Sequence, residues 1–114
     1  IPALQAVIRR DSNFSKAYNT LAETYFWAKD PAAGEAYFRE LAREQPSNAL
    51  PFLGLARLKT LQKQWAESLS AMVTCIRLDP ANPEIAGCYE ALIGGFLTWL
   101  AFRKRSSQIS GSLR

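Results

Sequence analysis

Residues 18–25 read Tyr-Asn-Thr-Leu-Ala-Glu-Thr-Tyr, and residues 52–59, which lie 34 positions later, read Phe-Leu-Gly-Leu-Ala-Arg-Leu-Lys. Both segments place a large aromatic residue first and the pair Leu-Ala fourth and fifth. Three further pairs fall into register at the same offset: Phe38 with Met72, Leu41 with Cys75, and Pro46 with Pro80. So many matches at one offset indicate an internal repeat, and a repeat of this length is typical of stacked helical units.

The apolar residues inside each unit have the spacing of an α-helix. Leu21, Ala22 and Tyr25 follow Tyr18 at intervals of three, four and seven residues, so all four lie on one helical face. Each face of this kind exposes apolar surface that only a neighbouring helix can cover. The pattern therefore predicts helices that pack in series.

Prolines and capping residues mark where these helices begin and end. Asp30 is a good cap for a helix whose first residue is Pro31, and Asn82 with Pro83 repeats that arrangement. The prolines that follow the second helix of each unit cannot continue it. We expect an all-α fold with helices over about 2–10, 15–28, 32–44, 49–62 and 65–78, and a further helix that begins near residue 84.

The charge of the chain is concentrated at one end. Residues 1–102 carry ten basic and ten acidic side chains, so the net charge of +4 comes from the C-terminal segment. The basic residues there are Arg103, Lys104, Arg105 and Arg114. Because a nucleic-acid binder carries its cations along the folded face that follows the phosphates, we expect no nucleic-acid partner.

These residues resemble the tetratricopeptide repeat family over a stretch from about Ile1 to Leu92. The matching positions of one complete unit are Tyr18, Leu21, Ala22, Tyr25, Gly34, Phe38 and Pro46, and those of the next are Phe52, Leu55, Ala56, Ser68 and Pro80. The chain departs from the family pattern at Lys59, where the family favours Tyr, and at Met72, where it favours an aromatic residue.

The resemblance implies a right-handed α-α superhelix, which is a solenoid of antiparallel helix pairs. It divides the chain into five segments. These are 1–14 as the second half of an incomplete unit, 15–48 and 49–82 as complete units, 83–102 as a capping or partial-unit helix, and 103–114 as a basic polar tail.

The resemblance also implies a concave groove, lined by the first helix of each unit, that binds a peptide or a helix of another protein. The implied groove residues are Asn19, Glu23, Phe26, Trp27, Leu50, Leu53, Arg57 and Leu61. Phe26, Trp27 and Leu53 lie off the stripe that packs the core, so either a partner or a neighbouring helix covers them. Some members of the family grip the carboxylate of chaperone tails, but Glu23 would repel such a ligand.

Residues 91–102 form an apolar run that continues where the earlier units turn, and basic residues follow it. Three interpretations compete for this segment. It caps the last unit, or it self-associates or receives a partner through Phe96, Trp99 and Phe102, or it enters a membrane. A spanning helix needs about 20 apolar residues, and this run has 12, so we rank the membrane interpretation last.

We expect a protein–protein interaction scaffold and not an enzyme. The chain has no histidine, which is the commonest general base, and Cys75 and Cys88 lie in apolar stretches where cysteine behaves as a core residue. We expect a cytoplasmic protein that needs no metal or cofactor. The alternative is a structural spacer or a self-association module of a larger multi-domain protein, with a homo-oligomer that forms through the C-terminal helix. A membrane-associated adaptor and an RNA-binding helical repeat rank lower.

Overall fold

The computed structural model describes the backbone of residues 1–112 and the side chains as far as Arg105. This part of the chain is all-α, as expected, and contains no strand. Its helices are α1 (Pro2–Arg10), α2 (Ser15–Trp27), α3 (Pro31–Glu44), α4 (Leu50–Leu61), α5 (Trp65–Leu78) and α6 (Pro83–Ser112). The starts of all six helices, and the ends of the first five, lie within one residue of the predicted positions.

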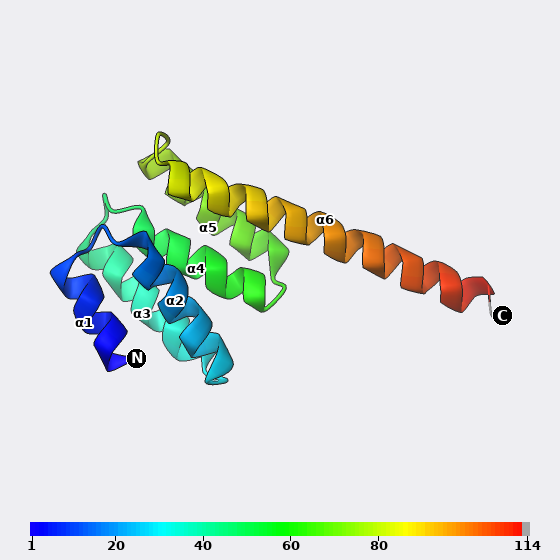
Figure 1. Cartoon of the computed structure of the whole chain (residues 1–114), viewed down its shortest axis with the longest axis horizontal. Coiled ribbons are helices and arrows are strands. Elements are labelled where there is room, and N and C mark those ends of the chain that lie inside the picture. The colour runs from blue at the N-terminus through cyan, green and yellow to red at the C-terminus, as the bar shows by residue number, and fades with distance from the viewer. Residues whose placement is uncertain (113–114) are drawn as a thin grey trace.

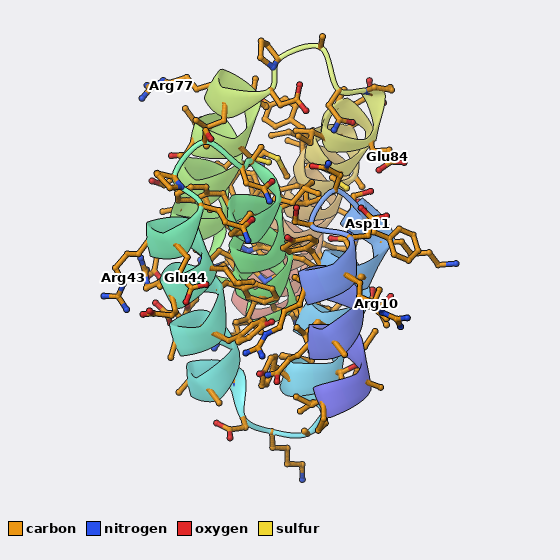
Figure 2. The ribbon with its side chains drawn as sticks, turned by 90° about the vertical axis from the view of Figure 1, so that its left-hand side faces the viewer. Arg10, Asp11, Arg43, Glu44, Arg77 and Glu84 are labelled. Carbon is orange, nitrogen blue, oxygen red and sulfur yellow. The ribbon has the colours of Figure 1, made fainter. Side chains whose placement is uncertain are left out.

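The helices pack in series, with α4 at the centre (Figure 1). Two hairpins, α2–α3 and α4–α5, lie side by side, and α4 contacts α2, α3 and α5. The short helix α1 packs against α2 at one end, and α6 lies along α5 at the other. Arg43 and Arg77, which hold equivalent positions on α3 and α5, point away from the body (Figure 2).

The turn inside each hairpin is built in the same way in both units. Lys29 and Lys63 have positive φ angles of 61° and 60°, a conformation that reverses the chain at the end of a helix. The backbone N–H of Asp30 donates to the carbonyl of Tyr25, and the N–H of Gln64 donates to the carbonyl of Lys59, 34 residues later, with equivalent geometry. The repeat seen in the sequence therefore extends to backbone conformation.

The core lies between the hairpins and depends on two close approaches by glycine. A Cβ atom on Gly54 would lie 2.5 Å from the ring of Phe38, and one on Gly34 would lie 2.9 Å from Tyr25. Gly54 thus lets α4 approach α3, and Phe38 fills the space and is fully buried. Ser68 on α5 is also fully buried, at the position equivalent to Gly34, and its hydroxyl donates to the carbonyl of Ala56.

Helix α6 belongs to the body at its start and leaves it farther on. Ile85 and Leu92 are buried, while the second half of the helix projects beyond the hairpins (Figure 1). We predicted a capping or partial-unit helix over 83–102, followed by a basic polar tail. Instead α6 continues to Ser112. Leu97 occupies the register of Lys29 and Lys63 but stays helical, and no proline follows it before residue 112. Residues 113 and 114 of the predicted tail lie outside the described residues.

Candidate protein-binding surface

Four of the predicted groove residues come together between α2, α4 and α6. Asn19, Glu23, Leu53 and Arg57 line a cavity of about 130 Å³, which Cys88 and Leu92 of α6 also line. The amide of Asn19 approaches the sulfur of Cys88 at 3.7 Å. The first half of α6 therefore forms one wall of this region.

Glu23 and Arg57 form an ion pair across α2 and α4. The Nε and Nη2 atoms of Arg57 donate to the same carboxylate oxygen of Glu23 at 3.2 and 2.9 Å. Both side chains are about 40% exposed, so the pair adds less than about 1 kcal/mol to folding stability. It presents one anion and one cation side by side on an accessible surface.

Leu50 and Leu53, which were predicted to face the groove, are buried at 4% and 1% exposure. Leu53 lies under α6, beside Cys88 and Leu92. The sequence left open whether a partner or a neighbouring helix covers Leu53. In this structure a neighbouring helix covers it. These two leucines contribute to packing and are not available to a partner in this structure.

Trp27 is the most exposed of the predicted groove residues, at 73%. It is the last residue of α2, and its ring meets that of Phe26 edge-to-face at 5.2 Å. Phe26 is half-buried and packs against the core, which holds the exposed indole on a fixed support. Leu61, at the equivalent position of α4, is half-buried.

The predicted second surface consists of Phe96, Trp99 and Phe102, and these residues have two different environments. Phe96 and Trp99 pack with Trp65, the first residue of α5, at ring-centre distances of 5.4 and 5.8 Å. The guanidinium of Arg103 lies 5.3 Å from the centre of the Trp99 ring. Phe102 takes no part in this cluster and is 71% exposed. The aromatic cluster thus joins α6 to α5 as far as Trp99.

One charged cluster was not predicted. The ammonium of Lys59, whose side chain is only 8% exposed, lies 2.9 Å from both Glu35 and Glu67 and 3.1 Å from the amide oxygen of Gln64. Burial alone would lower the pKa of Lys59, but its hydrogen bonds to the two carboxylates outweigh burial and raise that pKa. The hydrogen bond from Lys59 lowers the pKa of Glu35, and Arg39 adds to the effect. The sequence feature that could have indicated this cluster is Lys59, a charged residue at the position where the first unit has Tyr25.

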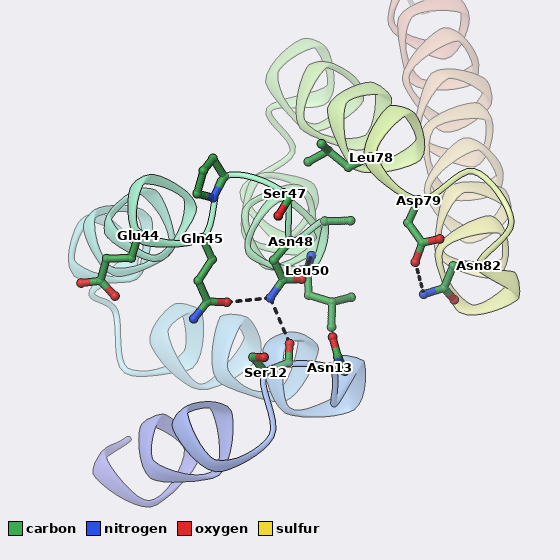
Figure 3. A pocket seen from close by; sticks show the side chains of 12 residues that line it. Ser12, Asn13, Glu44, Gln45, Ser47, Asn48, Leu50, Leu78, Asp79 and Asn82 are labelled. Carbon is green, nitrogen blue, oxygen red and sulfur yellow. Dashed lines mark hydrogen bonds between the residues drawn. The ribbon is translucent and has the colours of Figure 1, made fainter.

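A cavity of about 680 Å³ lies between the loops that join the helix pairs (Figure 3). Its polar groups are engaged with one another. The amide of Asn48 donates to Gln45 at 2.8 Å and to the backbone oxygen of Ser12 at 3.1 Å, and Asn82 donates to Asp79 at 3.1 Å. The Asn48–Gln45 and Asn82–Asp79 contacts are equivalent in the two units. We infer that the side chains around this cavity stabilise the loops and do not form a binding site.

The described residues contain no group of side chains arranged to hold a metal ion. Burial raises the pKa of the Cys75 thiol to about 12, so it stays protonated at neutral pH and is a poor nucleophile. By length and composition alone, Pro83–Arg105 is apolar enough to cross a bilayer. Only a small part of that stretch, which includes Ile85 and Leu92, is buried in the body.

Comparison with protein-family models, with curated proteins and with solved structures finds no match for this chain.

Proposed function

We propose that this chain is a protein-interaction scaffold that holds a peptide or a helix of a partner on the surface formed by α2 and α4. The fold that we propose for it is a right-handed superhelix of the tetratricopeptide kind. The 34-residue repeat of helix pairs and of positive-φ lysines supports this proposal. Such folds act through the surface that they display and not through a reaction.

The observation that carries the proposal is Trp27. A tryptophan left 73% exposed on a rigid helix is a large apolar surface in contact with water. Tryptophan and arginine are enriched among the residues that dominate binding energy at protein interfaces. Trp27 and Arg57 both lie on the α2–α4 surface, with Glu23 beside Arg57.

The chemistry of this surface defines the partner. An apolar anchor on the partner would pack against Trp27 and the edge of Phe26, while a charged or amide group would compete for Arg57 and Glu23. An amphipathic helix or an extended peptide carries both kinds of group. We propose no catalytic step, because the described surface pairs its charges and the Cys75 thiol is buried.

The test is quantitative capture of proteins from the source cell by the whole chain, followed by binding measurements with each purified candidate. Trp27→Ala and Arg57→Glu should each weaken binding of the true partner by at least about tenfold. Phe14→Ala is the matched control, since Phe14 is 44% exposed and precedes the opposite end of α2. Equal binding by wild type, both surface variants and the control would contradict the proposal.

A further inference from the structure

One face of α6 is open although its equivalents on α2 and α4 are covered. Leu21 of α2 is fully buried and Leu55 of α4 is 3% exposed, but Tyr89, at the same register of α6, is 37% exposed. Tyr25 and Lys59 are buried as well, whereas Ile93 at their register is only half-buried. Helix α3 covers this face of α2, and helix α5 covers the equivalent face of α4. Among the described residues no helix covers this face of α6.

A groove between α5 and α6 runs beside this open face. Val73, Ile76, Arg77, Pro80 and Tyr89 line a cavity of about 470 Å³ there, and Val73 is 44% exposed. The equivalent groove between α3 and α4 is open as well, and it is lined by Arg39, Ala42, Arg43, Phe52 and Leu55. Beside that groove, however, α5 packs antiparallel on α4 and covers its face. The repeat therefore indicates what fits on the open face: another helix, antiparallel to α6.

The sequence of α6 points to a particular helix. Glu90, Leu97 and Lys104 are spaced by seven residues, so they form a line along the open face with opposite charges at its two ends. Ile93 and Leu100 lie beside this line, and Leu97 and Leu100 are 58% and 40% exposed. When such a line meets its own copy antiparallel about Leu97, each glutamate opposes a lysine.

We propose that two copies of this chain pair through α6 in antiparallel orientation. Leu97 crosses Leu97 of the second copy, Ile93 and Leu100 flank the crossing, and Glu90 faces Lys104 of the second copy at both ends. The contact is isologous, so one surface serves both copies and the assembly closes as a dimer. It is separate from the α2–α4 surface proposed above for a partner protein.

Charge and geometry favour a second copy over a membrane. A bilayer would require Glu90 to enter the apolar phase together with the open face, and a buried carboxylate is costly there. Antiparallel pairing instead brings that carboxylate to a cation.

The first test measures the mass of the whole chain by sedimentation over about a hundredfold range of concentration. We expect the mass to rise from that of one chain, 12.7 kDa, toward twice that value. Leu97→Glu should raise the dissociation constant at least about tenfold. Thr98→Glu, which adds the same charge to an exposed residue outside the Glu90–Lys104 line, should leave it unchanged. Because Leu97 is already exposed, circular dichroism should show both variants folded.

The second test swaps the charges. Glu90→Lys and Lys104→Glu should each weaken the dimer, because like charges then meet at both ends of the contact. An equimolar mixture of these two variants should regain the dimer, since in the mixed pair every lysine meets a glutamate. Antiparallel pairing predicts both the loss in each single variant and the recovery in the mixture, whereas parallel pairing would already place like charges together in the wild type and would predict no loss in the single variants.

Three results would overturn the proposal. A mass of one chain at every concentration would exclude the dimer. Failure of the mixed variants to pair would exclude the stated register. Binding of the wild type to vesicles of mixed neutral and anionic lipid, with loss of binding by Leu97→Glu and no dimer in solution, would replace the second copy with a membrane surface.

Discussion

Helices α4 and α6 occupy equivalent places in the repeat but end differently. At the end of α4 the chain reverses through Lys63, at φ 60°, and α5 returns to bury Leu55 and Lys59. At the same register in α6 stands Leu97, the chain stays helical, and Tyr89 and Ile93 keep an open side. Reversal of the chain therefore decides whether an apolar helix face becomes core or remains surface.

The largest expected effect compares Leu55 with Tyr89. Leu55→Asp places a carboxylate in a site that is 3% exposed, so it should lower the free energy of unfolding by more than about 4 kcal/mol and abolish folding. Tyr89→Asp, at the equivalent but open position, should cost less than about 1 kcal/mol. Urea denaturation followed by circular dichroism measures both. The comparison is best made in the Leu97→Glu background, so that dimer formation does not contribute.

Alanine substitutions at two glycines, one in α4 and one in α6, should change the stability of the fold in opposite directions. Gly54→Ala forces a Cβ atom to within 2.5 Å of the Phe38 ring and should destabilise the fold by about 1–3 kcal/mol. Gly94→Ala meets no atom within 4 Å and should stabilise α6 by up to about 1 kcal/mol, because alanine is the better helix former. Thermal unfolding midpoints that move in the same direction for both variants would argue against the described packing of α4.

The cluster of Lys59, Glu35 and Glu67 predicts a dependence on pH. The pKa of Glu35 is lowered in the folded state, so its contribution to stability is present above the unfolded pKa near 4.5 and is lost as pH falls through the folded value. The pKa of Lys59 is raised, so its contribution is lost as pH rises through a folded value above 10.5. Lys59→Met should remove the alkaline loss and reduce the acid loss. Unfolding titrations from pH 2 to 12 would show this as a flatter stability profile, and an unchanged profile would mean that the cluster is not coupled to folding.

The smallest expected effect on stability concerns Glu23 and Arg57. Because both side chains are about 40% exposed, Glu23→Gln should change the free energy of unfolding by less than about 1 kcal/mol. It should nevertheless weaken capture of a partner by the α2–α4 surface. A loss of stability as large as that of Gly54→Ala would assign this pair to folding and not to binding.

The turns and the helix bounds could be predicted because they depend on local residues. Asp30 with Pro31 and the prolines after each unit fix the ends of helices through capping and steric rules. The burial of Leu53 could not be predicted from the chain alone, since it depends on how α6, packed along α5, lies beside α2 and α4. The same is true of Phe96 and Trp99, whose contact with Trp65 follows from that packing. The end of α6 was misjudged because polarity in a sequence does not by itself stop a helix.

Hydrogen exchange along α6 tests the central comparison most directly. In the Leu97→Glu variant, amides between Ile85 and Leu92 should exchange more slowly than amides beyond Leu100, because Ile85 and Leu92 are buried in the body. In the wild type at high concentration, the amides around Leu97 and Leu100 should become protected as the second copy covers them. Equal protection along α6 in both proteins would contradict the claim that this helix joins the core at its start and offers an open face farther on.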